Sequence, residues 1–236
     1  MKAIMISIQP QWVGLILNYI KKDEIRKGTA IGKAINKLIE KQGVAPMFIY
    51  CTKGKETLWR YNDLYTFGIL SRDVEKQFCA YGINSKALGR KLLDFLCENG
   101  IKMQICTSII STLLNGKVVA RFNATAEHIE YETCSRDISG WWKDDGKMYD
   151  HKDACLNYKE MFDYVGAGEG TAVHINDLEI FDEPKELSEF RKPSTFSLEQ
   201  LREFGLPYTE QMYKDMATKG KWFITRAPQS WCYVEI

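Results

Sequence analysis

The stretch Lys2–Lys27 reads KAIMISIQPQWVGLILNYIKKDEIRK and predicts a strand, a short helix and a second, charged strand in succession. Its first part, Lys2 to Ile8, is mostly apolar, which favours a buried strand over one that faces solvent. Pro10 is typical of the first turn of a helix, because its missing N–H leaves no hydrogen bond unmade there. Apolar residues then recur at the spacing of one buried helix face: Val13, Ile16, Leu17 and Ile20.

The end of this stretch, Lys21–Lys27, is mostly charged and predicts an edge strand of a sheet. Successive side chains of a strand point to opposite faces. One face would therefore carry Lys21, Asp23, Ile25 and Lys27, and the other face would carry Lys22, Glu24 and Arg26.

The composition is that of an ordinary globular protein, with 45% hydrophobic and 27% charged residues among 236. No apolar run approaches the roughly 18 residues that a membrane span requires, and the apolar start lacks the cleavage site of a signal peptide. We therefore expect a cytoplasmic protein without membrane contact. Seven cysteines without a C-x-x-C pair, and three histidines without ligand spacing, predict reduced thiols, no metal and no cofactor.

Charge is unevenly distributed along the chain, although the net charge is only +1. Between Ile20 and Gln42, seven basic residues stand against three acidic ones, which gives a local net charge of +4. A phosphate backbone would bind to such a patch. The alternative is a solvated helix face, and the sequence leaves both interpretations open.

The rest of the chain predicts short strands with interspersed helices. A helix is expected after Thr29, with Gly43 at its end, and two helices are expected after Ser71 and Ser85. Further helices are expected at Leu156–Tyr164, Ser197–Phe204 and Thr209–Thr218, and strands at Met47–Cys51, Lys117–Asn123, Ala124–Glu132, Thr171–Phe181 and Trp231–Ile236. Ser135–Asp153 is expected to be a polar loop, whose Trp141-Trp142 pair would either stack on bases or fold onto the sheet. The varied connections favour an α+β fold, a small mixed barrel with peripheral helices.

Several blocks of the chain resemble one known family. They are Lys21-x-x-x-x-Arg26 after a strand and helix, Ile49–Lys55, Leu114–Val119, His174–Leu178 and Pro228–Glu235. The pattern resembles the ASCH domain of the PUA-like β-barrel superfamily, and within it the phage and mobile-element branch of predicted regulators. The resemblance implies a single PUA-like domain over residues 1–236, with a helical insertion at about 56–112.

The resemblance also implies a ligand cleft beside Lys21–Arg26, which would hold RNA, DNA or a modified nucleoside or nucleotide. The expected lining comprises Ser7, Gln9, Trp12, Lys21, Glu24, Arg26, Lys27, Gln229, Ser230 and Trp231. An aromatic face stacks on a base, and amides and hydroxyls read its hydrogen-bonding edge. The alternative is that Trp12 and Trp231 belong to the core and that Glu24 forms a surface ion pair.

Two other functions remain open at this stage. Some proteins that resemble this family hydrolyse the amide of acetylated cytidine, and others are ribonucleases, which makes Lys21 and Glu24 candidate catalytic residues. The sequence departs from the hydrolase pattern, because Tyr19 stands where a glycine is usual and Glu24 stands where a threonine is expected. The third possibility is a regulatory module that binds a protein partner through the helical insertion.

Overall fold

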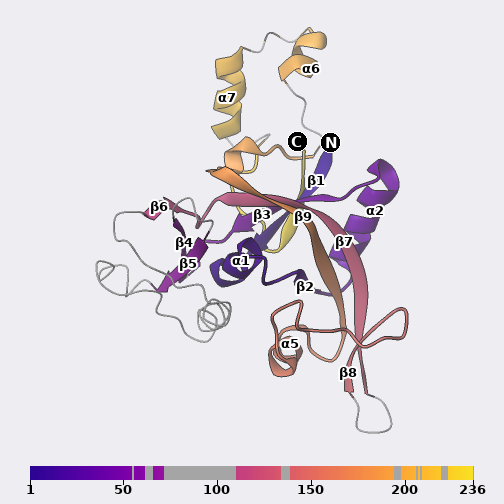
Figure 1. Ribbon diagram of the computed structural model, residues 1–236. Coiled ribbons are helices and arrows are strands. Elements are labelled where there is room, and N and C mark those ends of the chain that lie inside the picture. Colours follow the sequence, from indigo (N-terminus) through magenta and orange to yellow (C-terminus); the bar gives the residue numbers. More distant parts are fainter. Residues whose placement is uncertain are drawn as a thin grey trace.

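The computed structural model describes residues 1–54, 56–61, 66–71, 110–133, 139–193, 198–205, 207, 209–218 and 223–235. These residues form a mixed α+β fold with a seven-stranded sheet, a separate three-stranded sheet and five α-helices (Figure 1). The predicted α+β class is therefore confirmed. Among the described helices, none has both the length and the hydropathy that crossing a membrane would require.

The main sheet has the order β10-β1-β3-β7-β9-β2, with β8 paired to β7. Its strands are β1 (Lys2–Ile8), β2 (Asp23–Lys27), β3 (Pro46–Cys51), β7 (Val118–Thr133), β8 (Ser139–Lys143), β9 (Glu169–Lys185) and β10 (Trp231–Glu235). The smaller sheet has the order β5-β4-β6 and contains β4 (Glu56–Tyr61), β5 (Thr66–Ser71) and β6 (Ile110–Leu113). The helices are α1 (Pro10–Leu17), α2 (Ala30–Gln42), α5 (Tyr158–Val165), α6 (Leu198–Glu203) and α7 (Glu210–Thr218), with a 3-10 turn at Leu187–Glu189.

The main sheet is open, so the predicted closed barrel is wrong for the described residues. Strands β10 and β2 lie at its two ends and do not pair with each other. Side chains span the gap instead of backbone hydrogen bonds. Arg26 on β2 donates to the carbonyl oxygen of Ser7 on β1 (2.7 Å) and to the hydroxyl of Ser230, just before β10 (3.2 Å).

The first strand and the start of the first helix form where the sequence predicts, but α1 ends at Leu17, so Ile20 lies outside the helix on which it was expected. β1 lies between β10 and β3, and residues Ala3 to Ile8 are buried, because one face packs on α1 and α2 and the other on Phe190 and Ile224. Helix α1 begins at Pro10, and α2 ends before Gly43, whose φ of 79° is the left-handed conformation that glycine adopts without strain. Thr29 precedes α2 as expected, but its side chain makes no capping hydrogen bond.

Three details of the predicted strands are wrong. The charged edge strand begins at Asp23, and the N–H groups of Lys22 and Asp23 both donate to the carbonyl oxygen of Asp153, which lies outside the sheet. Lys117–Asn123 and Ala124–Glu132 are parts of one continuous strand, β7, which pairs along its length with β9. The polar loop Ser135–Asp153 contains β8, because Trp141 is buried opposite Tyr131 of β7.

The predicted insertion at about 56–112 is described only in part. Its described residues form β4, β5 and β6, and Ser71 ends β5. The helices expected after Ser71 and Ser85 lie outside the described residues. The remaining helices and the final strand occur close to the positions that the sequence predicts.

Candidate functional site

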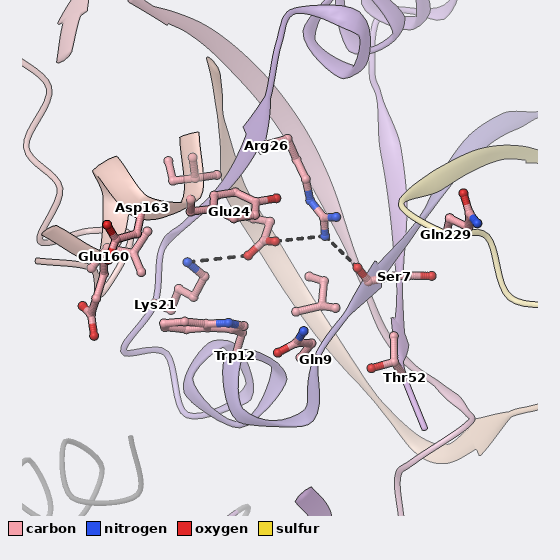
Figure 2. Close-up of a pocket in the computed structure, with 14 residues that line it drawn as sticks. Ser7, Gln9, Trp12, Lys21, Glu24, Arg26, Thr52, Glu160, Asp163 and Gln229 are labelled. Atoms are coloured by element: carbon pink, nitrogen blue, oxygen red, sulfur yellow. Dashed lines mark hydrogen bonds and ion pairs between the residues drawn. The ribbon is translucent and has the colours of Figure 1, made fainter. Parts of the chain in front are cut away.

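A pocket of about 680 Å³ opens where the two ends of the main sheet approach each other (Figure 2). It is built from the end of β1, the start of α1, β2 and the segment Leu156–Tyr164. Seven of the ten predicted ligand-binding residues line it: Ser7, Gln9, Trp12, Lys21, Glu24, Arg26 and Gln229. The structure thus brings into one cavity residues from both ends of the chain, although their role in binding stays a prediction.

Lys21 lines the pocket and is only 3% exposed. Its ammonium donates a hydrogen bond to the carbonyl oxygen of Ala154 (2.7 Å) and lies 3.5 Å from Oε2 of Glu24. Burial lowers the pKa of Lys21 below the usual lysine range, although the charge of Glu24 opposes this shift. The amine therefore loses its proton more readily than a surface lysine does.

Glu24 is a buried carboxylate held between two cations. Its Oε1 lies 2.9 Å from a terminal nitrogen of Arg26, and its Oε2 faces Lys21 on the other side. Because Glu24 and Arg26 are two residues apart on β2, both point into the pocket, as the predicted alternation requires. Lys21 reaches the same pocket from outside the strand, so the prediction that it faces away from Glu24 is wrong.

Trp12 combines core packing with a place in the pocket wall. Its indole is partly buried against the core around α1, and the ammonium of Lys21 lies 5.0 Å from the ring centroid (Figure 2). A cation over an aromatic face is attracted by the ring quadrupole. Lys21 therefore already covers part of the face of Trp12 that a base would use for stacking.

The walls of the pocket differ in charge. Ser7, Gln9, Thr52 and Gln229 form a neutral, hydrogen-bonding side, whereas Glu160 and Asp163 of α5 form an acidic side (Figure 2). Thr52 and the α5 residues, Tyr164 among them, were not predicted to line the cleft. The resemblance placed the cleft at the two ends of the chain and gave no signal for α5, whose position depends on packing between segments more than 100 residues apart.

Three predicted site residues lie outside the pocket lining. Lys27 is exposed at the end of β2, with its ammonium 5.3 Å from the ring centroid of Tyr164. Ser230 is exposed and accepts the hydrogen bond from Arg26. Trp231 packs against Tyr233 and the main core, which agrees with the structural alternative for this residue.

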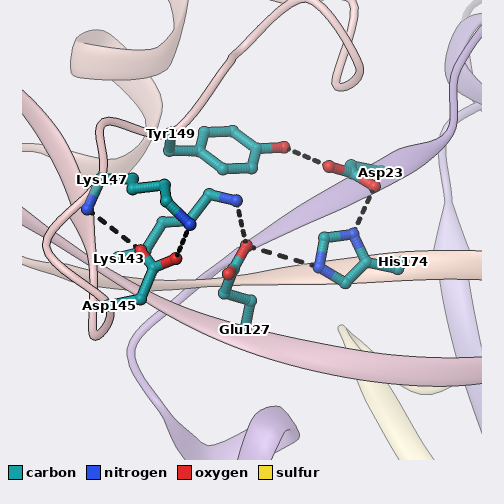
Figure 3. Close-up of polar contacts among 7 residues, drawn as sticks. All are labelled: Asp23, Glu127, Lys143, Asp145, Lys147, Tyr149 and His174. Atoms are coloured by element: carbon teal, nitrogen blue, oxygen red, sulfur yellow. Dashed lines mark hydrogen bonds and ion pairs between the residues drawn. The ribbon is translucent and has the colours of Figure 1, made fainter.

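A second polar cluster surrounds Asp23 (Figure 3), whose side chain points to the other face of β2 from that of its neighbour Glu24. Asp23, the first residue of β2, accepts hydrogen bonds from the hydroxyl of Tyr149 (2.6 Å) and from Nδ1 of His174 (2.8 Å). Nε2 of His174 lies 3.5 Å from Glu127, which in turn lies 3.1 Å from the ammonium of Lys143. The cluster joins β2, β9, β7, β8 and the loop after β8.

The charges of this cluster shift the pKa values of its members. Burial alone would raise the pKa of Asp23, but the hydrogen bonds from His174 and Tyr149 outweigh it and lower that pKa below its usual value. The hydrogen bond to Asp23 raises the pKa of His174, with a further contribution from the charge of Glu127. The imidazole is therefore protonated over a wider pH range than a free histidine.

The described residues contain no group of three or more His, Cys, Asp or Glu side chains placed to hold a metal ion. Comparison of the sequence with family models and with curated proteins finds no match in either case.

Proposed function

We propose that this protein binds a nucleobase in the pocket beside Lys21–Arg26, either within RNA or DNA or as a modified nucleoside or nucleotide. The observation that carries the proposal is the convergence on one cavity of about 680 Å³ of Trp12, Lys21, Glu24, Arg26 and Gln229. Ligand pockets for small molecules are typically about 300–1,000 Å³. The proposal includes a regulatory role for this binding. It also includes a fold that is PUA-like and of the ASCH type.

The chemistry of the pocket supports a base as the ligand. Gln9, Gln229 and Ser7 offer amide and hydroxyl groups to a hydrogen-bonding edge, and Tyr164 and the part of Trp12 that Lys21 leaves uncovered offer aromatic surface. Lys21 and Arg26 stand on either side of the Glu24 carboxylate, and Glu160 and Asp163 add two further carboxylates to the lining, so the pocket offers partners to donor atoms of a base as well as to acceptor atoms. Arg26 is already bonded to Glu24, Ser7 and Ser230, which supports a positioning role for it rather than a phosphate contact.

A thermal-shift screen tests the proposal with nucleosides, modified nucleosides and short single-stranded oligonucleotides. A ligand present at about 100 times its dissociation constant adds about 2.7 kcal/mol to the stability of the native state. For a chain of this size that corresponds to a rise in melting temperature of about 5–10 °C. The shift is expected to disappear in Gln9→Ala and Gln229→Ala, whose exposed side chains line the pocket without belonging to the core.

Gln211→Ala is the matched control for these variants, because Gln211 is an exposed glutamine of α7 and not part of the pocket lining. A shift that the control keeps and both glutamine variants lose would support the pocket as the binding site. No shift with any probe would reject the proposal in its nucleobase form, and an equal loss in all three variants would place binding elsewhere.

The second candidate function is a hydrolase of the same fold, an amidohydrolase on a modified nucleoside or a ribonuclease. The observation that favours it is the buried amine of Lys21, whose pKa is lowered, 3.5 Å from the Glu24 carboxylate. Such a pair is suited to proton transfer at neutral pH. In the amidohydrolase case, Glu24 would take a proton from the attacking water and Lys21 would give one to the leaving amine.

Mass spectrometry on each mixture of the screen separates the two functions. A change in ligand mass that is lost in Lys21→Gln and in Glu24→Gln, with both variants folded, would identify an enzyme. A thermal shift with unchanged ligand mass would identify a binding protein and reject the hydrolase.

A further inference from the structure

Several residues that do not line the pocket contact the segment that carries Lys21. The segment Ile20–Asp23 runs beside the loop that follows β8, and backbone hydrogen bonds join the two. The N–H groups of Lys22 and Asp23 both donate to the carbonyl oxygen of Asp153, at 2.8 and 3.0 Å. The next carbonyl along, that of Ala154, accepts the hydrogen bond from the Lys21 ammonium. The position of Lys21 therefore depends on how this loop lies against β2.

The side chain of Asp23 connects β2 to this loop and to β9 by hydrogen bonds. Its carboxylate is 6% exposed, and its two oxygens have different partners. One oxygen accepts the hydroxyl of Tyr149, which belongs to the loop, and the other accepts Nδ1 of His174, which is the register partner of Asp23 on β9. Because β2 pairs with β9 alone in the described sheet, these two side-chain bonds add to the backbone bonds to Asp153 in holding its first residues in place.

The charge state of His174 decides how many of these contacts are favourable. With both ring nitrogens protonated, the imidazolium donates to Asp23 through Nδ1 and faces Glu127 through Nε2–H, at 3.5 Å. With only Nδ1 protonated, the lone pair of Nε2 faces the carboxylate of Glu127, which is a repulsive arrangement. The groups that face the imidazole are thus Asp23 on β2, Glu127 on β7, Lys143 on β8 and, through Asp23, Tyr149 (Figure 3).

We propose that Asp23, Tyr149 and His174 are positioning residues for the pocket. Their contacts hold the backbone that carries Lys21 and Glu24, and this backbone becomes more mobile when His174 loses its proton. The inference rests on the proposed function, because only a pocket that binds a ligand needs positioning residues. The contacts themselves are present without a ligand. The raised pKa of His174 agrees with a protonated imidazole in the closed arrangement. The pocket is consequently tighter at mildly acidic pH than at alkaline pH.

Amine labelling of the protein without ligand tests this inference. Acetic anhydride is applied at a series of pH values, and peptide mass spectrometry gives the labelling rate of Lys21 relative to that of the exposed Lys37. The comparison is between the wild type and His174→Asn, whose amide keeps a donor toward Asp23 but does not titrate. Both proteins share the titration of Lys21 itself, so the difference between them reports on His174.

At about one pH unit below the ordinary histidine pKa of about 6.5, Lys21 of the wild type is expected to label about fivefold to tenfold more slowly than Lys21 of His174→Asn. At about pH 9 the two proteins are expected to label alike, because His174 is then neutral. His128→Asn is the matched control, since His128 also faces a carboxylate, that of Asp144 at 2.7 Å, but does not contact β2 in any interaction of the described residues. This control is expected to behave as the wild type does at every pH.

Tyr149→Phe gives a second test that does not depend on titration. It removes only the hydroxyl that donates to Asp23, so the ring keeps its place in the core, and Lys21 is expected to label several-fold faster at all pH values. Equal Lys21 labelling in the wild type and His174→Asn across the series, or the same pH effect in His128→Asn, would overturn the inference. Since no ligand is used, a failed nucleoside screen rejects the proposed function and leaves this test unaffected.

Discussion

Replacing Arg26 with methionine is expected to destabilise the protein far more than removal of an ordinary surface arginine. The Arg26 and Glu24 side chains are only 11% and 9% exposed, and their closest atoms are 2.9 Å apart. Removing one partner of a buried ion pair costs about 3–5 kcal/mol, because the other charge is left in the interior. Lys21 still faces Glu24 in the variant, which reduces this cost, while the carbonyl oxygen of Ser7 loses a donor worth about 1 kcal/mol. We expect a net loss of about 3 kcal/mol.

Arg121→Met provides the matched control for this prediction. Arg121 forms an ion pair with Glu179 at 2.6 Å, shorter than that of Arg26, but both side chains are about half exposed. Exposed ion pairs contribute about 0–1 kcal/mol, because water already solvates the two charges. The two substitutions are chemically identical, so the difference between them measures the effect of burial and of the gap between β1 and β2.

Urea unfolding followed by far-ultraviolet circular dichroism measures both variants. A shift of the midpoint at an unchanged slope gives the change in free energy of unfolding. Arg26→Lys is expected to fall between the wild type and Arg26→Met, because it keeps a positive charge beside Glu24 but lacks the planar fork that reaches Ser7 and Ser230 at once. Equal losses of less than about 1 kcal/mol in Arg26→Met and Arg121→Met would refute the reasoning that Arg26 bridges the two ends of the sheet.

Three further predictions follow from the burial and charge of particular residues. Asp23 stabilises the folded protein above its ordinary pKa of 3.8, and this contribution is lost as the pH falls through its lower pKa in the folded state. His174 stabilises the folded protein below its ordinary pKa of 6.5, and this contribution is lost as the pH rises through its higher pKa in the folded state. The free energy of unfolding should therefore be greatest between pH values of about 3.8 and 6.5. In urea titrations, the wild type and His174→Asn should differ in stability at acidic pH and have the same stability at alkaline pH. Cys51 is fully buried with a raised pKa, so iodoacetamide should label it only on unfolding, as judged by peptide mass spectrometry; labelling of the native protein would contradict its position in the core. Trp141→Ala should cost about 3–5 kcal/mol in urea unfolding and Trp142→Ala much less, because only Trp141 is buried among aromatic rings; equal costs would mean that both indoles pack alike.

Local patterns in the sequence were sufficient for the opening unit of the fold. The apolar run of β1, the proline at the start of α1 and the glycine after α2 each act within a few residues, and each has its expected place. Strand alternation likewise placed Glu24 and Arg26 on one face, because the direction of successive side chains is a property of the extended backbone. The gathering of distant residues at one pocket was suggested only by the resemblance, and their role in binding stays a prediction.

Other features depend on partners that no local pattern reveals. Lys21 joins Glu24 in the pocket because a carbonyl 133 residues away accepts its hydrogen bond, and β8 forms because Trp141 finds Tyr131 on a neighbouring strand. The closed barrel expected from short strands is not formed by the described strands: β10 and β2 end an open sheet, and Arg26 of β2 donates a hydrogen bond to Ser7 of β1.

By itself, the sequence determined where the first strand and the first two helices begin and that a charged edge strand follows the first helix, because periodicity and backbone preference are local. Only the tertiary structure decided which of these residues meet. Asp23 lies 126 residues from Tyr149 and 151 from His174, and burial of their shared polar groups is stable only when all three are brought together. A buried charge needs a hydrogen-bonding or charged partner, and the packing of the whole fold decides which residue that partner is.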